Sequence, residues 1–188
     1  ASDRAKTARQ MVFELLISDQ PERETAHDPQ SKFWKWADRM NVAASRFPEN
    51  VKQPSPDRSH VAMAVNLDAC IHCNLCVRAC REVQVNDVIG MAYRHDAAKI
   101  VFDFDDPMGA STCVACGECV QACPTGALMP AREAALPEPD RQVDSVCPFC
   151  GVGCQLTFNV RDDQIVYVEG RNGPANQGRL CVKGRYGF

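Results

Sequence analysis

Twelve cysteines, gathered in three groups, are the residues of this 188-residue chain best suited to chemistry. Neighbouring cysteines within a group are separated by only two or three residues, apart from one distant member of the last group. Cysteines this close cannot readily pair with one another in disulfides, and such bunching is typical of metal binding. A disulfide-rich secreted protein is the alternative, but no charged-then-apolar leader with a small-residue cleavage site is present. The pattern therefore predicts thiolate ligands, and we expect a cytoplasmic protein.

The first two groups share the spacing C-x2-C-x2-C-x3-C, and the second is followed by Pro124. Arg81 stands where the first group would have its proline. In bacterial two-cluster ferredoxins with this spacing, the fourth cysteine of each run ligates the other cluster. The predicted ligand sets are therefore Cys70, Cys73, Cys76 and Cys123 for one [4Fe–4S] cluster, and Cys113, Cys116, Cys119 and Cys80 for the other.

Structural zinc is the alternative for these two runs. Zinc fingers and ribbons use pairs of ligands separated by a longer arm, which two complete four-cysteine runs fit poorly. The runs therefore favour iron–sulfur clusters. His72 lies between two cysteines, but with four thiolates available per cluster we interpret it as a solvent-facing or supporting residue. His27 and His60 have no spare thiolates beside them, and we expect them to be non-ligands.

The third group contains Cys147, Cys150, Cys154 and Cys181, spaced C-x2-C-x3-C-x26-C. It reads CPFCGVGC at its start and NQGRLCVKGR at its end. This stretch resembles the N-terminal [4Fe–4S] domain of molybdenum or tungsten bis-pterin oxidoreductases, such as formate dehydrogenases and nitrate reductases. The resemblance implies a third [4Fe–4S] cluster on these four cysteines. It also implies that Lys183 relays electrons between cluster and pterin, because that family has a lysine just after the fourth cysteine.

The two kinds of motif together narrow the resemblance. A ferredoxin-like pair with a long insert is similar to the alpha subunits of NAD-dependent formate dehydrogenases, to related formate dehydrogenases and to the relay domain of iron–iron hydrogenases. A hydrogenase would continue into its own catalytic cysteine motifs, whereas this chain continues into the bis-pterin pattern. The resemblance, which covers roughly residues 60–188, is therefore strongest to the alpha subunit of a formate dehydrogenase.

That resemblance implies formate oxidation at a Mo or W bis-pterin guanine dinucleotide centre in the remainder of the catalytic subunit, with no catalytic residue in this segment. Electrons would pass through the three clusters to a flavin-containing, NAD-reducing subunit. Another bis-pterin reductase, such as nitrate reductase, and a metal-binding module without electron flux are the alternatives. Related alpha subunits often carry further clusters near residues 11–50, but no cysteine precedes Cys70, so we expect none in this segment.

Composition excludes two other classes of partner. The net charge is −3, and no basic stripe is present that would neutralise phosphates, so we expect no nucleic acid. The longest apolar run, Met11–Ile17, is interrupted by Glu14 and is too short for a membrane span. Hydrophobic residues make up 45% of the chain, which favours packed globular structure.

The elements that position the cysteines are predicted as an α+β fold. We expect a helical lead-in and linker at 1–59, a two-cluster ferredoxin-like domain at 60–130, a linker at 131–144 and a bis-pterin type cluster domain built on a β-hairpin from 145 to 188. In the lead-in, Ala8, Met11, Val12, Leu15 and Leu16 form one apolar stripe at helical spacing.

A second helix is expected to begin at Asp28 as its N-cap, with Pro29 at the first helical position. It would bury Phe33, Trp36, Ala37 and Met40. Pro48, Pro54 and Pro56 predict an extended linker, and residues 61–67 a strand. Hairpins are expected from 89–94 with 99–104 and from 155–161 with 164–169, because apolar residues alternate there.

Overall fold

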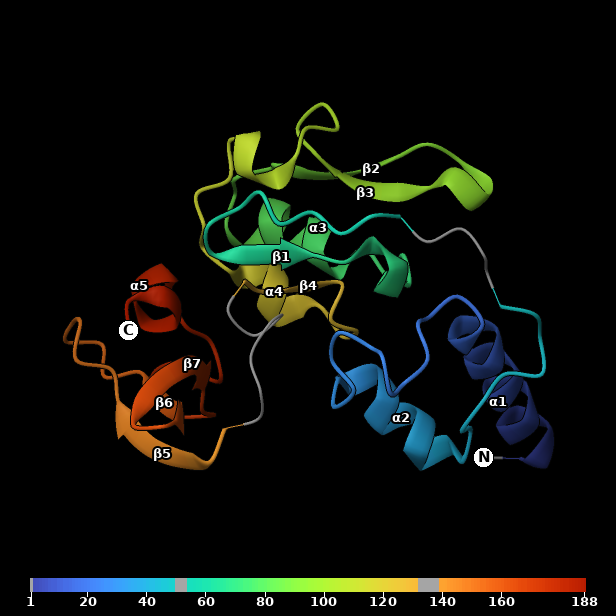
Figure 1. Cartoon of the computed structure of the whole chain (residues 1–188), viewed down its shortest axis with the longest axis horizontal. Helices are drawn as coiled ribbons and strands as arrows, with labels where there is room; N and C mark the ends of the chain where they lie inside the picture. Colours follow the sequence, from blue (N-terminus) through green and yellow to red (C-terminus); the bar gives the residue numbers. More distant parts are fainter. Residues whose placement is uncertain (1, 50–53, 132–138) are drawn as a thin grey trace.

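The computed structural model describes residues 2–49, 54–131 and 139–188, and it shows three parts along the chain (Figure 1). Two helices come first, a unit of short strands and short helices follows, and a three-stranded sheet with a final helix comes last. The described residues combine helices with small antiparallel sheets, as the predicted α+β class implies.

The first part consists of α1 (Asp3–Ile17) and α2 (Lys32–Met40). Serine hydroxyls cap both helices, since Ser2 accepts from the amide of Ala5 and Ser31 from the amide of Trp34. Phe33, Trp34 and Ala37 of α2 form a small buried core. Phe13 of α1 stacks on Phe33 with ring centroids 5.2 Å apart, so aromatic packing joins the two helices.

The predicted start of the second helix was wrong by three residues. Asp28 does not cap it; its carboxylate accepts from the amide of Gln30 in a preceding turn. Phe33 and Ala37 are buried as predicted, but Trp36 is 49% exposed and Trp34 is buried in its place.

The predicted apolar stripe of α1 is also largely exposed, and Met11, Val12 and Leu15 face solvent in this structure. The helix contacts the core through Phe13, Leu16 and Ile17. Helical spacing alone did not fix which side of α1 would meet the aromatic residues of α2. Only Leu16 of the predicted stripe lies on the packed side.

The middle part holds two antiparallel pairs of strands. β1 (Met63–Val65) pairs with β4 (Leu128–Pro130), and β2 (Ile89–Ala92) pairs with β3 (Lys99–Phe102). The β2–β3 hairpin confirms the prediction, whereas β1 is shorter than predicted and β4 was not foreseen. The short helical segments of this part are η1 (Leu67–Ala69), α3 (Leu75–Arg78), the π-helical turn η2 (Ala79–Val83), η3 (His95–Ala97), η4 (Met108–Ala110) and α4 (Glu118–Ala122).

One core lies between these strands and short helices. Met63, Ile89, Phe102, Met108 and Leu128 are buried in it. Three cysteines, Cys76, Cys80 and Cys119, belong to the same cluster of buried side chains. The thiols are therefore part of the interior of this unit, and the apolar residues around them exclude water.

The last part is a sheet with the order β5–β6–β7, formed by β5 (Arg141–Val146), β6 (Gln155–Arg161) and β7 (Gln164–Gly170). The β6–β7 hairpin confirms the prediction to within one residue. The predicted linker at 131–144 was wrong from Arg141 onward, while residues 132–138 lie outside the described residues. β5 is polar and mostly exposed, so its sequence lacks alternation, and pairing with β6 makes it a strand.

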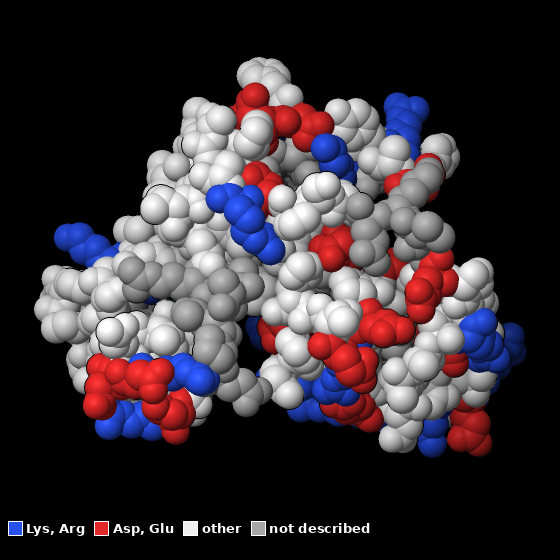
Figure 2. Space-filling model, in the orientation of Figure 1, with Lys and Arg blue, Asp and Glu red and all other residues white. Residues whose placement is uncertain are grey.

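The chain then returns through a loop to α5 (Val182–Tyr186), which lies beside the middle part (Figure 1). Figure 2 shows acidic and basic side chains intermixed over the three-stranded sheet, where Arg141 pairs with Asp163.

The proline linker that the sequence predicts lies partly outside the described residues, which omit 50–53. Within its described part, Asp57 forms an isolated β-bridge with Val65 of β1. Among the described residues, no helix is long and apolar enough to cross a membrane.

Candidate iron–sulfur sites

The first site is a small cavity in the middle part, surrounded by four cysteines from two distant segments. Three of them come from the loop before α3 and from α3 itself, and the fourth follows α4. The thiols lining this cavity are Cys70, Cys73, Cys76 and Cys123. Ile71, Ile100, Pro124 and Leu128 also line it, so its walls are largely apolar.

The second site is a neighbouring cavity with the complementary set, Cys113, Cys116, Cys119 and Cys80. Cys80 reaches it from η2, the π-helical turn that continues α3. The amide of Val88 donates to Cys80 Sγ at 3.3 Å, which fixes that thiol beside β2. The two sites thus exchange their fourth cysteines in the structure, which is the arrangement that the spacing predicts.

The two loops that carry the cysteines have the same unusual backbone. His72 and Ala115, each two residues after the first cysteine of its run, have φ values of 54° and 57°. Asn74 and Gly117, two residues further on, are also left-handed, with φ values of 60° and 76°. Successive turns of this kind direct amide N–H groups inward and favour negative charge. His72 therefore contributes its backbone here, and its side chain is exposed.

Two of these amides, those of Ala115 and His72, lie beside cysteine sulfurs. The N–H of Ala115 donates to Cys113 Sγ at 3.4 Å, and the N–H of His72 lies where it lowers the pKa of Cys70. Burial is the larger influence, and together with Cys123 and Cys73 it raises the pKa of Cys70 to about 11. Burial likewise raises the pKa of Cys76 to about 12 and that of Cys119 well above its ordinary value.

These thiols fit an iron–sulfur cluster in number, chemistry and surroundings. Four cysteines around one cavity form the donor set of a [4Fe–4S] cluster. Buried thiols would stay protonated on their own, so positive iron in the cavity is what would favour the thiolate form. The described residues include no group of three His, Cys, Asp or Glu side chains arranged to hold a single metal ion.

The third site lies between the three-stranded sheet and α5. Cys147 follows β5, Cys154 precedes β6, and the amide of Cys147 donates to the carbonyl of Cys154 at 2.8 Å. Burial raises the pKa of Cys154, and the thiols of Cys147, Cys150 and Cys181 raise it further, so all four lie near one another. Cys147 is buried, whereas Cys150 and Cys181 are exposed. The four predicted residues therefore gather at one place that is open on one side.

Asn176 holds the loop that brings Cys181 back to this site. Its side-chain amide accepts from the N–H of Gln155 at 3.1 Å and donates to the carbonyls of Gln155 and Arg179, each at 2.9 Å. Gln155 directly follows Cys154, so this buried amide ties the two ends of the ligand loop together. Sequence reasoning gave Asn176 no role, because its partner is distant in the chain.

The remaining candidate residues are placed as follows. Lys183 lies in α5, two residues after Cys181, and its side chain is exposed. His27 pairs with Asp68 at 2.8 Å, and His60 accepts from the amide of Ala62 through Nδ1 at 3.1 Å. Neither histidine lines the two cysteine cavities.

The helical first part covers one side of the first site. The amide of Phe33 donates to the carbonyl of Pro124 at 2.9 Å, and Pro124 directly follows Cys123. Ile71, which follows Cys70, packs against Phe33 and its buried neighbours. The lead-in therefore contacts both segments that supply cysteines to the first site.

Two family models match the chain in the regions of these sites. Residues 69–127 match a 4Fe-4S dicluster domain, and residues 140–188 match the Fe4S4 domain of molybdopterin oxidoreductases. The second match begins with β5, so it includes the strand that the sequence did not reveal.

Similar proteins cover most of the chain. One of the subunits of NADH-quinone oxidoreductase in Rhizobium meliloti is 37% identical over 151 residues, which are 77% of this chain and 17% of that protein. A Staphylococcus haemolyticus protein named "Putative formate dehydrogenase" is 28% identical over 162 residues, which are 64% of this chain and 16% of that protein. The chain thus spans about a sixth of the length of these relatives.

A solved structure shares the fold. It is that of an NAD+-reducing [NiFe]-hydrogenase, with a TM-score of 0.64 and 22% identity over 69% of this chain and 56% of that one. The cysteine sites, the two family matches and the oxidoreductase relatives agree with one another. The two cysteine cavities therefore lie in a region similar to a 4Fe-4S dicluster domain, and the third cysteine group lies in a region similar to the Fe4S4 domain of molybdopterin oxidoreductases.

Proposed function

We propose that this chain is the electron-transfer portion of a formate dehydrogenase catalytic subunit. The observation that carries the proposal is the combination of two cysteine sites with exchanged fourth members and a molybdopterin-type Fe4S4 domain in one chain. Relatives named for formate dehydrogenase match 64% and 63% of this chain within a longer protein. Formate as the substrate and NAD+ as the acceptor are part of the proposal.

The proposed ligands are the three sets of four cysteines, each holding one [4Fe–4S] cluster. When bound, such clusters accept and release single electrons at potentials that hydrogen bonds, burial and charge adjust. The chain supplies hydrogen bonds and differences in burial. Amides of Ala115 and Val88 donate to cysteine sulfurs, buried apolar residues surround Cys76 and Cys119, and the third site is more exposed.

The proposed partners are the remainder of the catalytic subunit, with a Mo or W bis-pterin guanine dinucleotide, and a flavin-containing, NAD-reducing subunit in the cytoplasm. Oxidation of formate to carbon dioxide releases two electrons and one proton. Reduction of NAD+ takes up two electrons and one proton, so the two half-reactions balance. Lys183 would lie between the third cluster and the pterin, where its charge stabilises a more reduced, more negative cluster.

A second candidate is a relay subunit of an NADH-quinone oxidoreductase. The 37% identity to the Rhizobium meliloti protein of that complex favours it. In that case electrons would enter from NADH, and the third cluster would have no formate-oxidising metal centre beside it.

Anaerobic reduction of the full-length protein with its partner subunits separates the two candidates. Molybdenum or tungsten near one atom per chain, with cluster reduction by formate, would support formate dehydrogenase. Cluster reduction by NADH but not formate, with neither metal present, would support the quinone-linked relay instead. Reoxidation of the reduced clusters by nitrate would identify another bis-pterin reductase.

A further inference from the structure

An ion pair joins the third site to the second. Arg179 Nη1 donates to Glu118 Oε1 at 2.6 Å, and the Glu118 side chain is only 7% exposed. Glu118 lies between Cys116 and Cys119 of the second site, and Arg179 lies two residues before Cys181 of the third. The pair therefore connects the two backbone segments that carry cysteines of different sites.

Close backbone packing accompanies this ion pair. The guanidinium of Arg185 in α5 donates to Gln121 Oε1 in α4. Gly117 has φ +76°, and a Cβ built there would lie 2.7 Å from Arg185 Cδ and 2.8 Å from Tyr186 Oη. A glycine between Cys116 and Cys119 thus allows α5 to approach the second-site loop.

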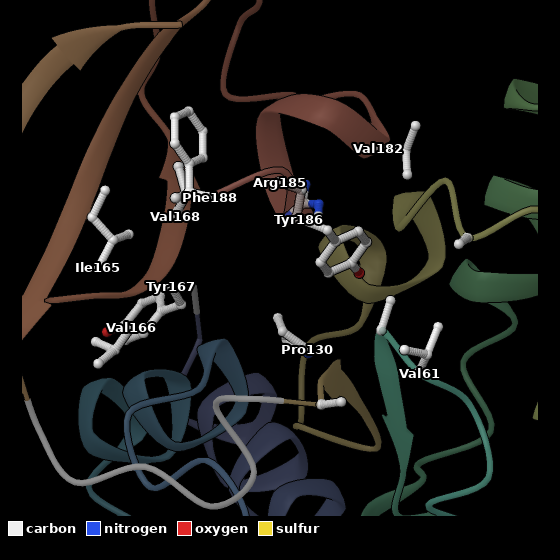
Figure 3. Close-up of a pocket in the computed structure, with 13 residues that line it drawn as sticks. Val61, Pro130, Ile165, Val166, Tyr167, Val168, Val182, Arg185, Tyr186 and Phe188 are labelled. Carbon is white, nitrogen blue, oxygen red and sulfur yellow. The ribbon is translucent and has the colours of Figure 1, made fainter. Parts of the chain in front are cut away.

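The groove beside α5 shows the same neighbours. Ala115, between Cys113 and Cys116, lines it together with Val182, Arg185 and Tyr186. Figure 3 shows Arg185 and Tyr186 on α5, next to the short helix of the middle part. Three observations therefore place the segment of the third site against the loop of the second site. They are the ion pair, the close approach at Gly117 and the groove beside α5.

Energetics distinguish this pair from the surface ion pairs of the chain. Exposed pairs contribute little, about 0–1 kcal/mol. A buried carboxylate is different, because removing its partner leaves an uncompensated charge in the interior. Arg179 is also held in place, since its carbonyl accepts from Asn176. The backbone of Arg179 is thus anchored, while its side chain is 55% exposed and that of Glu118 is buried.

We propose that Glu118 and Arg179 are positioning residues that set the distance between the second and third sites. It follows that the second site, rather than the first, is the electron-transfer neighbour of the third site. This inference rests on the proposed function, because it requires clusters at both sites.

The test compares single and paired variants in the full-length protein. Glu118→Gln and Arg179→Gln each break the ion pair, whereas Arg179→Lys keeps the charge without the planar fork. The charge exchange Glu118→Lys with Arg179→Asp restores opposite charges. Arg141→Gln is the matched control, since it breaks the exposed pair with Asp163 at 2.8 Å in the same domain. Iron content, magnetic coupling between reduced clusters and rapid-mixing reduction of each cluster are measured for all variants.

We expect full iron content in every variant. Coupling between the second and third clusters should weaken, and electron transfer between them should slow several-fold, in Glu118→Gln and Arg179→Gln. Arg179→Lys should show a smaller defect, and Arg141→Gln none. The charge exchange should recover much of the coupling.

Unchanged coupling and rates in both single variants, with iron retained, would overturn the positioning role and leave the proposed function standing. If the single variants lose iron, recovery of iron and coupling by the charge exchange supports the proposal, and failure to recover them overturns it. Absence of iron from the unmodified protein would instead refute the proposed function itself.

Discussion

Cys80 and Cys123 are the residues through which the first and second sites depend on each other. Each closes a cavity whose other three cysteines come from the opposite run. Cys80 is 7% exposed and accepts from the amide of Val88, so its position is fixed by η2 and by the start of β2. The spacing predicts this exchange through its likeness to two-cluster ferredoxins, and short-range chain geometry alone would not.

Replacing Cys80 with Ala should damage the cluster held by Cys113, Cys116 and Cys119. The cluster beside its sequence neighbours should survive, because all four thiols of the first site remain. Cluster-resolved electron paramagnetic resonance measures both signals. Cys123→Ala is the matched variant and should give the mirror result. Loss of the first-site signal in Cys80→Ala would show that the ligand assignment is wrong.

Lys183→Ala should leave cluster assembly intact, since every predicted ligand remains. In the proposed formate dehydrogenase, electron transfer from the metal centre to distal acceptors should slow, because the positive charge and hydrogen-bonding group that we place beside the third cluster are lost. Lys183→Arg keeps the charge but changes reach and donor geometry, so its defect should be smaller. Rapid-mixing reduction that follows metal centre and clusters separately is the measurement. If the clusters of Lys183→Ala are reduced as fast as those of the unmodified protein, Lys183 is only an exposed charge with no role in electron transfer.

The helices and strands that the sequence predicts are determined by local residue patterns, whereas those that it misses are determined by contacts with other parts of the chain. The hairpins β2–β3 and β6–β7 follow from alternating apolar residues on both strands, so local pattern and final structure agree. β5 is polar, and its identity as a strand comes from hydrogen bonds to β6. α2 begins at Ser31–Lys32 although Asp28–Pro29 is an equally good starting pair by residue type; Asp28 instead begins a separate turn, which the Ser31 amide closes on the Asp28 carbonyl at 3.1 Å.

In the candidate sites, too, some features follow from local sequence and others only from contacts between distant residues. Cysteine spacing identifies which thiols gather, since few arrangements other than metal ligation use such short intervals. The left-handed turns at His72 and Ala115 could not be predicted, because neither residue favours that conformation by itself. Glu118, Arg179 and Asn176 were missed for another reason. Their partners lie 61 residues away for the ion pair and 21 for Asn176 with Gln155.

Substitution of the two tryptophans tests which face of α2 packs against the small aromatic core. Trp34 is 3% exposed and Trp36 is 49% exposed. Trp34→Ala should lower the free energy of unfolding by about 3–5 kcal/mol, because it opens a cavity in the small aromatic core. Trp36→Ala should cost much less and serves as the matched control. Denaturant unfolding of both variants gives the comparison, and equal losses would contradict the assignment of Trp34 to the packed face of α2.

At the scale of the whole molecule, the three parts are joined in series around the sites. The helical lead-in packs on the first site, the first and second sites share the middle core, and α5 packs on the second-site loop. Each candidate cluster site thus has a structural neighbour on the next part of the chain. This arrangement suits stepwise electron transfer, which requires closely spaced centres.

Anaerobically prepared protein should contain about twelve iron atoms and as many sulfides per chain, as three [4Fe–4S] clusters require. Elemental analysis and sulfide assay of the same sample measure both. The triple replacement of Cys147, Cys150 and Cys154 by Ser should reduce iron to about eight, because the middle part keeps its own ligands. Reproducible zinc, or about eight iron atoms in the unmodified protein, would contradict the three-cluster assignment.

The exchange of fourth cysteines also determines what a cut in the backbone would do. The turn at Arg94–Ala97 between β2 and β3 is exposed, so a protease could cleave the chain there. One fragment would then carry Cys80 and the first three cysteines of the first site, and the other would carry Cys123 and the remaining three of the second. Each cluster would bridge both fragments, so the nicked protein would stay in one piece even after losing either cluster. Pairing of β1 with β4 and of β2 with β3 would also join the two fragments, so the clusters would add two covalent links to a contact that the strands already make.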